Sequence, residues 1–279
     1  MKSLKYYLEK ARKEKWAIGQ FNFSNLKILK AIIQAAKEKK SPIIVGTSER
    51  ESKSIGISQA VALVESYRKE TGLPIFLNLD HGKSFNYIKK AINAGYDAVH
   101  FDGSKLPLKE NIKITKKIVR YAHKKNILVE GEVGVIGSVS DRKEVLTDPL
   151  DALKFVEGTK VDSLAVAIGN LHGIRISGIN PNLNLKRLEE IKKKVEIIPL
   201  VLHGGSGTPK KDIKAAIKLG VVKINVNTEL RIAYTNTLRK VLKKKPKEIT
   251  PYKYMPEVIK AVQEVVEEKI KLFGSVNKI

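Results

Sequence analysis

Three histidines in this sequence each end a short apolar run and directly precede glycine. His81 lies in Leu-Asp-His-Gly, His172 in Leu-His-Gly and His203 in Leu-His-Gly-Gly-Ser. A neutral imidazole can bind a metal ion, and glycine-rich turns ahead of a helix expose backbone N–H groups that bind phosphate. A single motif of this kind is more often a buried histidine beside an ordinary turn, so its recurrence decides the interpretation.

Small polar and acidic residues follow the other apolar runs in the same manner. If the runs are strands of one parallel barrel, these residues meet at the rim formed by the carboxyl ends of the strands. In chain order they are Asn22, Ser48, Asp80, Asp102, Glu132, Gly173, Gly204, Gly205, Ser206, Asn225, Asn227 and Thr228. His100 lies within a run and His123 on a helical segment, so we expect both to be structural.

Three imidazoles around one point, with positions left open, predict a catalytic zinc site. A structural site would use all four positions and would favour cysteine. The small polar residues after the sixth to eighth runs lie where such barrels bind phosphate. Asn22 and Ser48 lie across the rim, which indicates a substrate with an anionic group at each end. A divalent ion between them would act as a Lewis acid on a carbonyl and stabilise an enediolate.

A lysine nucleophile is the main chemical alternative to a metal. Schiff-base formation needs a lysine in a desolvated pocket that lowers its pKa. Lys223, inside the eighth run, is the nearest candidate. Because no lysine directly follows a run in an apolar pocket, the pattern favours the metal.

Eight apolar, β-branched runs each precede a segment with helical periodicity. The runs cover residues 16–22, 43–45, 75–79, 97–101, 127–131, 163–168, 197–202 and 222–226. Eight such units predict an α/β fold, a (β/α)₈ TIM barrel. A doubly wound open sheet is the alternative, but no G-x-G-x-x-G follows the first run. We therefore expect one domain, residues 1–279, with an appended C-terminal helix over 255–273.

The composition is that of a globular protein with a strong positive charge. Of 279 residues, 42% are hydrophobic and none is cysteine, which excludes disulfides and thiolate metal sites. No run approaches the ~20 apolar residues of a membrane span, and the N-terminus does not resemble a signal peptide, so we expect a cytoplasmic protein. The net charge of +24 comes from lysines spread over the helical segments. Without aromatic-rich strands, this favours a solvated surface over a specific nucleic-acid site.

The motifs at the ends of the runs resemble those of the class II, metal-dependent ketose-bisphosphate aldolases. The resemblance covers residues 16–279 and rests on Asn-Leu-Asp-His-Gly at 78–82, Phe-Asp-Gly-Ser-Lys-Leu-Pro at 101–107, Glu-Gly-Glu-Val-Gly at 130–134, Ala-Ile-Gly at 167–169, His-Gly at 172–173, Val-Leu-His-Gly-Gly-Ser-Gly at 201–207 and Lys-Ile-Asn-Val-Asn-Thr-Glu-Leu at 223–230. It implies zinc-dependent cleavage of fructose 1,6-bisphosphate to dihydroxyacetone phosphate and glyceraldehyde 3-phosphate, as in glycolysis and gluconeogenesis. It also implies a homodimer or homotetramer.

Carried over to this sequence, the family pattern assigns a role to each rim residue. His81, His172 and His203 match the zinc ligands, while Asp102 and Glu132 match carboxylates that hold the metal in an alternative position or a second ion. Asp80 matches the acid that protonates the aldehyde oxygen. The residues that match the dihydroxyacetone-phosphate pocket are Gly173, Gly204, Ser206, Asn225, Asn227 and Thr228, and those that match the glyceraldehyde-3-phosphate end are Asn22 and Ser48. Three imidazoles also suit Co²⁺ or Fe²⁺, and the family often uses a monovalent cation at the phosphate pocket.

The chain departs from the family pattern in the loop after the fifth run. Ser140 stands where the family has a glutamate that abstracts a proton, so Asp141 and Glu144 become the candidate catalytic bases. Tyr252 stands where many relatives have an arginine near the distal phosphate, and Ile176 where a lysine is common. These departures leave alternatives open: tagatose 1,6-bisphosphate or another ketose phosphate as substrate, or a weakly active, metal-retaining phosphosugar-binding protein. A metal-dependent hydrolase would normally show an early His-x-His, which this sequence lacks.

Overall fold

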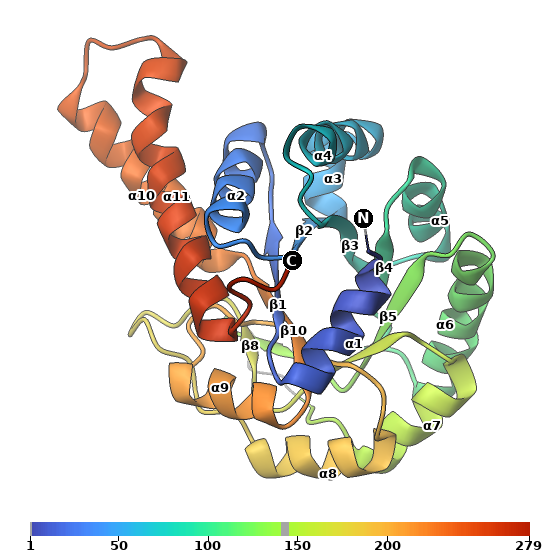
Figure 1. Cartoon of the computed structure of the whole chain (residues 1–279). Helices are drawn as coiled ribbons and strands as arrows, with labels where there is room; N and C mark the ends of the chain where they lie inside the picture. The colour runs from blue at the N-terminus through green and yellow to red at the C-terminus, as the bar shows by residue number, and fades with distance from the viewer. Residues whose placement is uncertain (1, 141–144) are drawn as a thin grey trace.

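In the computed structural model, which describes residues 2–140 and 145–279, eight parallel strands close into a barrel (Figure 1). The (β/α)₈ prediction is therefore confirmed. Around the barrel the strand order is β1-β10-β9-β7-β5-β4-β3-β2. Their bounds are β1 Ile18–Asn22, β2 Ile43–Ser48, β3 Ile75–Gly82, β4 Ala98–Phe101, β5 Leu128–Val133, β7 Ser163–Val166, β9 Leu200–Leu202 and β10 Val221–Val226. Two short segments, β6 Gly137–Ser138 and β8 Leu171–His172, pair separately in parallel.

Helices surround the barrel, and most of them bury an apolar face against it (Figure 1). In α2, for example, Ile28, Leu29, Ile32 and Ile33 are buried, as their helical spacing requires. The helix expected after the second run, over 58–69, is confirmed as α4, and an additional short helix, α3, precedes it. The two meet at Gly56, whose φ of 96° a residue with a side chain rarely adopts. The helices are α2 Leu26–Glu38, α3 Glu49–Ile55, α4 Ile57–Thr71, α5 Phe85–Ala94, α6 Leu108–His123, α7 Pro149–Thr159, α8 Leu185–Val195 and α9 Lys210–Lys218.

The N-terminal segment forms helix α1, Leu4–Glu14, at the amino-terminal end of the barrel. Its residues Leu4, Tyr7 and Leu8 pack with Phe76 and Val222 near the starts of their strands. An amphipathic pattern there therefore marks a cover for the barrel, which leaves the carboxyl ends of the strands as the open face. Within the described residues, none of the helices has the length and apolar character needed to traverse a membrane.

Two long C-terminal helices, α10 Thr228–Lys244 and α11 Pro251–Phe273, run side by side and extend beyond the barrel (Figure 1). The appended helix begins four residues before the expected start, with Pro251 in its first turn. It packs along α2, where Lys39 Nζ and Glu267 Oε2 lie 2.9 Å apart. Lys269 of α11 also contacts Glu229 at the start of α10, at 2.8 Å.

Candidate active site

A β-bulge near the end of β3 points two consecutive side chains into the site. Leu79 pairs with Val99 and Gly82 with Phe101, so β3 uses one residue more than β4 over this interval. In a regular strand Asp80 and His81 would face opposite sides of the sheet. His81 has a φ of 51°, in the left-handed region. A residue other than glycine is strained there and keeps this conformation only when the surrounding structure supports it. The bulge therefore places a carboxylate and an imidazole at the same point.

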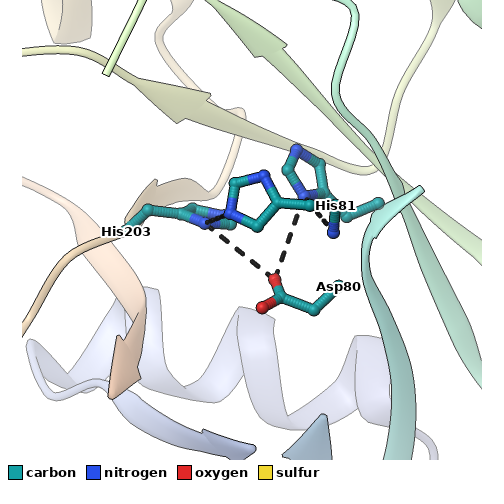
Figure 2. A group of neighbouring side chains, drawn as sticks. Asp80, His81 and His203 are labelled. Atoms are coloured by element: carbon teal, nitrogen blue, oxygen red, sulfur yellow. Dashed lines mark hydrogen bonds and ion pairs between the residues drawn. The ribbon is translucent and has the colours of Figure 1, made fainter. Parts of the chain in front are cut away.

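The three predicted histidines come together at the open face. His203 Nδ1 lies 3.0 Å from His81 Nε2 and 4.0 Å from Asp80 Oδ1, and Figure 2 shows these three side chains facing one another. The His172 ring lies 4.9 Å from the His81 ring and 6.2 Å from the His203 ring, measured between centroids. Residues more than 120 positions apart thus share one cluster.

His100 belongs to the same cluster, although we expected it to be structural. Its ring is fully buried, and its Nδ1 accepts a hydrogen bond of 3.1 Å from the His81 backbone N–H. A neutral imidazole that accepts at Nδ1 carries its proton on Nε2, which lies 3.3 Å from Glu132 Oε2. His100 therefore supports the strained backbone of His81. A histidine inside a four-residue apolar strand was the available signal. His123, by contrast, pairs with Asp162 away from the cluster.

Two carboxylates stand on the other side of His81. Asp102 Oδ2 lies 3.1 Å from His81 Nδ1 and also pairs with Lys83. The ligand atoms of His81, Asp102 and Glu132 lie within 4.8 Å of one another, as do those of Asp80, His81, His100 and His203. Either group could hold a metal ion.

Orphaned polar atoms fit the same conclusion. Among the described residues, buried Asn78 Oδ1, Glu132 Oε2, His100 Nε2 and Asn225 Oδ1 make no hydrogen bond, and of these Glu132 Oε2 and His100 Nε2 face each other at 3.3 Å. Buried polar atoms are normally paired, because an unpaired one costs about 1–3 kcal/mol. Nitrogen and carboxylate-oxygen donors are the ligands that zinc and similar divalent ions use. The residues present therefore fit a divalent metal.

The electrostatics of the cluster keep its carboxylates ionised. Burial opposes this, but the surrounding histidines, His81 first, hold the pKa of Asp80 well below its usual range. Burial would likewise lower the pKa of His81, yet the carboxylates around it, with Asp80 foremost, raise its pKa to about 9. Burial and the neighbouring His81 lower the pKa of His172 to about 4. His81 is thus positively charged at neutral pH, while His172 is neutral.

A buried ion pair supports His203 from inside the barrel. His203 Nε2 lies 2.7 Å from Glu130 Oε1, and Lys223 Nζ donates to Glu130 Oε2 at 2.7 Å. Burial raises the pKa of Glu130, but Lys223 and His203 outweigh it and the pKa falls well below the usual range. Because Nε2 donates to Glu130, His203 Nδ1 is left to face the metal centre. Lys223, weighed above as a nucleophile, is held in this ion pair.

Close backbone packing shapes the glycine-rich turns. Gly204 has a φ of 67°, and a Cβ there would lie 2.2 Å from the Leu171 carbonyl oxygen. The Gly205 N–H donates to the Asn225 carbonyl at 2.9 Å, which commits one of the donors expected for substrate. Gly173 has a φ of 95°. These turns hold β8 and the segment after β9 together, beside Ser206 and the start of α10 at Thr228.

Two asparagines to which the sequence assigned no role fix these turns. Asn180 Nδ2 donates to the carbonyls of Gly173 and Ser206, both at 2.9 Å. Asn170 Nδ2 donates to the His203 carbonyl at 3.0 Å, and its Oδ1 accepts the Ile168 N–H. The position of Asn170, two residues after the apolar run at 163–168, was the signal in the sequence, whereas Asn180 lies in the loop before α8.

Across the rim, Asn22 and Ser48 surround the carboxylate of Glu51. Asn22 Nδ2 donates to Glu51 Oε2 at 3.0 Å and to Asp80 Oδ2 at 2.9 Å. The Ser48 N–H donates to Glu51 Oε2 at 2.8 Å, and Asn227 Nδ2 to Glu51 Oε1 at 3.0 Å. Sequence reasoning missed Glu51, although the Ser-x-x-Glu spacing from Ser48 is a helix-capping signal.

A cavity of about 650 Å³ opens beside the cluster. Four candidate metal ligands line it (His81, Asp102, Glu132, His172), together with Lys83, Lys105 and, from the described part of the loop after β5, Val135, Ile136, Ser138 and Val145. Asp141 and Glu144, the candidate bases, lie outside the described residues. Ser140, the last described residue before them, is exposed, and its Oγ lies 3.0 Å from Ser138 Oγ, which lines the cavity.

Comparisons with known proteins agree with this geometry. A family model described as "Fructose-bisphosphate aldolase class-II" matches residues 2–278. The chain is 41% identical to the "Probable fructose-bisphosphate aldolase" of Bacillus subtilis (strain 168), over 99% of this chain and 98% of that protein. It is 42% identical to the "6-phospho-5-dehydro-2-deoxy-D-gluconate aldolase" of Bacillus licheniformis, over 99% and 96%. The crystal structure of the YdjI aldolase from Escherichia coli K12 matches with a TM-score of 0.88 at 35% identity, over 100% and 99%.

Proposed function

The chain belongs to the class II fructose-bisphosphate aldolase family, whose members are lyases, and from this membership we propose a specific reaction. The protein cleaves fructose 1,6-bisphosphate reversibly to dihydroxyacetone phosphate and glyceraldehyde 3-phosphate. The observation that carries the proposal is the meeting of His81, His172 and His203 beside Asp80 at the carboxyl ends of the strands. That face is where barrels of this type place their catalytic groups.

We propose His81, His172 and His203 as the ligands of a zinc ion, with Asp102 and Glu132 serving an alternative position or a second ion. Co²⁺ or Fe²⁺ would also suit three imidazoles. When bound, the ion supplies a Lewis acid that polarises the substrate carbonyl. Glu130 and His100 then hold two of these ligands in position. Glu130 contacts the His203 ring, and His100 accepts a hydrogen bond from the His81 backbone N–H.

Asp80 is placed to move the proton of the substrate hydroxyl at the bond that breaks. Asn22 Nδ2 holds its Oδ2 at 2.9 Å and Asn225 Nδ2 its Oδ1 at 3.0 Å. Both oxygens are thus fixed, and the lowered pKa of Asp80 keeps the group ionised. An ionised Asp80 accepts the proton in cleavage and returns it to the aldehyde oxygen in the reverse reaction.

The loop after β5 would supply the base that exchanges a proton with the other product. We propose Asp141 or Glu144 for this role, since Ser140 has no basic side chain. Loss of a general base costs about 10²–10⁴-fold in rate. Asp141→Ala and Glu144→Ala are made separately, and the variant that lacks the base should show this loss in kcat while the other keeps its turnover. Full turnover in both variants would exclude both residues as the base.

The remaining rim residues would bind the two phosphates. We propose that Gly173, Gly204, Ser206, Asn225, Asn227 and Thr228 bind the dihydroxyacetone-phosphate end, with a monovalent cation as in the family, and that Asn22 and Ser48 face the glyceraldehyde-3-phosphate end. Gly205, whose N–H is bonded to the Asn225 carbonyl, shapes the turn of this pocket. Helix α10 begins at Thr228, and a helix N-terminus favours an anion. The expected homodimer or homotetramer and the cytoplasmic location are part of the same proposal.

A second substrate is favoured by one specific observation. The relative from Bacillus licheniformis, 42% identical, is named for 6-phospho-5-dehydro-2-deoxy-D-gluconate. The deciding experiment is a coupled assay of aldol cleavage by the zinc-loaded protein, with that compound, fructose 1,6-bisphosphate and tagatose 1,6-bisphosphate, each with and without chelator. Turnover of the fructose compound that chelation abolishes and zinc restores is expected. Undiminished cleavage by metal-free protein would refute the metal mechanism, and no triose phosphate release would leave a sugar-phosphate-binding protein.

A further inference from the structure

The rim of the site contains a carboxylate of the chain itself, that of Glu51. Glu51 lies in the first turn of α3, and its side chain is 11% exposed. Its two carboxylate oxygens accept hydrogen bonds from three strand ends: Asn22 of β1, the Ser48 N–H of β2 and Asn227 after β10. Arg231 Nη2 lies 3.6 Å from Oε1. Donors from separate strands that converge in this way form an anion-binding site, and Glu51 occupies it.

Two of these contacts, those from Asn22 and the Ser48 N–H, use groups that would otherwise bind a substrate phosphate at the distal end. The third, from Asn227, ties Glu51 to the opposite end of the site. Asn22 Nδ2 is shared between Glu51 and Asp80, so the amide bridges two carboxylates. A phosphate that approached Asn22 and Ser48 would meet the charge of Glu51 at close range. Like charges side by side are strongly unfavourable, and the effect grows where the groups are shielded from water.

We infer that Glu51 is a specificity-determining residue that weakens the binding of an anionic group at the distal end of the substrate. The inference rests on the proposed function, because it takes Asn22 and Ser48 to face that end. A distal hydroxyl, which can donate a hydrogen bond to the carboxylate, meets no such penalty. Glu51 therefore reduces the affinity for a bisphosphate relative to the affinity for a ketose 1-phosphate.

A purely structural role for Glu51 predicts the opposite sign. If Glu51 only held Asn22 and Ser48 in position, its removal would disorder the distal pocket and weaken the bisphosphate complex. If Glu51 repels the distal phosphate, its neutralisation strengthens that complex. Glu51 also forms a capping box with Ser48, so its loss costs about 1 kcal/mol of helix stability. Thermal unfolding of each variant therefore accompanies the binding measurements.

The test compares fructose 1,6-bisphosphate with fructose 1-phosphate, which lacks the distal phosphate. Calorimetry on the zinc-loaded full chain gives Kd for both ligands, and the coupled assay gives KM and kcat. The variants are Glu51→Gln and Glu51→Ala, which remove the charge, and Glu51→Asp, which keeps it. The matched control is Glu49→Gln, in the same helical turn. Glu49 Oε1 accepts the Lys83 N–H at 2.7 Å, and among the described residues Glu49 makes no hydrogen bond with Asn22 or Asn227.

We expect Glu51→Gln and Glu51→Ala to lower Kd for the bisphosphate by about tenfold, with Kd for fructose 1-phosphate changed less than about twofold. Glu51→Asp and Glu49→Gln should leave the ratio of the two Kd values near that of the wild type. An unchanged or raised Kd for the bisphosphate in both neutral variants, or parallel changes for both ligands, would overturn the inference. Absence of turnover in the wild type would instead refute the proposed function, and the Kd values would still decide the role of Glu51.

Discussion

At the scale of single residues, the pair of Glu130 and Lys223 places two opposite charges inside the barrel behind His203. Both side chains are about 5% exposed, and they contact at 2.7 Å. Removal of one partner from a buried pair leaves an uncompensated charge, which costs about 3–5 kcal/mol, whereas removal of both is often nearly neutral.

This asymmetry predicts the outcome of a double-mutant cycle. Glu130→Gln should lower the free energy of unfolding of the metal-free protein by about 3–5 kcal/mol, and Lys223→Met by a similar amount. The double variant should lose much less than the sum of the two. Urea denaturation measures all four proteins. Strict additivity would show that the two charges do not compensate each other.

The proton at the centre of the cluster makes a second prediction at this scale. His81 donates from Nδ1 to Asp102 and from Nε2 to His203 Nδ1, an arrangement that needs the protonated ring. Its pKa is raised to about 9, so His81 is charged at neutral pH and must lose a proton when it binds a metal. Zinc affinity should therefore rise with pH, by about tenfold per unit below pH 9.

The measurement is competition between the protein and a calibrated chelator across the neutral range, with calorimetry in buffers of different ionisation enthalpy to count the protons. About one proton should be released per zinc ion bound. Asp102→Asn removes one of the carboxylates that raise the pKa of His81, so the pH dependence should flatten toward neutral pH. Zinc binding without proton release would contradict the protonated His81.

The position of a site residue on its strand decides whether the sequence could predict it. His81 and His203 lie at the ends of barrel strands, so the barrel rule alone places them on one rim, whereas His172 lies six residues beyond the end of β7, on β8. His100 and Glu130 lie within strands, where period-two alternation does not say which face is inside a barrel of unknown register. Glu51 could not be identified either, because its role depends on Asn22 and Asn227, which lie far away in the sequence.

At the scale of elements, the eight strand–helix units were predictable because each strand is a β-branched run of the right length. The bulge in β3 was not, since it is a shift of register between two strands rather than a property of one. The loop strands β6 and β8 were also missed, because two-residue segments carry no periodicity. The bulge places Asp80 beside His81, and β8 carries His172, so the geometry of the site depends on both irregular elements.

The third prediction concerns Gly204, after β9, which packs against Leu171 of β8. Gly204 and Gly72 have φ values of 67° and 68°, but a Cβ at Gly204 would lie 2.2 Å from the Leu171 carbonyl oxygen, whereas nothing lies within 4 Å of one at Gly72. Both changes to alanine incur the left-handed strain of about 1–2 kcal/mol. Only Gly204→Ala must also displace the backbone next to His172, at a further cost of about 1–3 kcal/mol.

Urea denaturation of the two variants isolates the contact, because the strain is common to both. Zinc affinity gives an independent measure: Gly204→Ala should weaken it and Gly72→Ala should not. Equal stabilities for the two variants would show that β8 yields to the added methyl group without cost.

At the scale of the whole molecule, positive and negative charges are separated between the outer helices and the site. The excess of lysines lies mainly on exposed helix faces, while the carboxylates of the site are buried at one end of the barrel. A single domain over residues 1–279 stays a prediction. The charge of +24 gives the whole molecule a field that attracts anions such as sugar phosphates, and this attraction weakens with salt.

The ligand set joins distant parts of the barrel, which makes the metal a structural link for the whole molecule. His81 lies on β3 and His203 follows β9, and along one side of the barrel β4, β5 and β7 lie between these two strands. A ligand that binds only the folded state stabilises it by about 2.7 kcal/mol at a concentration 100 times its Kd. Zinc should therefore raise Tm by several degrees, and a chelator should reverse the change. His203→Ala, which removes one ligand, should abolish most of the shift, whereas His123→Ala, at the C-terminal end of α6 and paired with Asp162, should retain it. A shift of equal size in His203→Ala would place the bound ion elsewhere on the protein, and the metal could then have no part in holding β3 and β9 together.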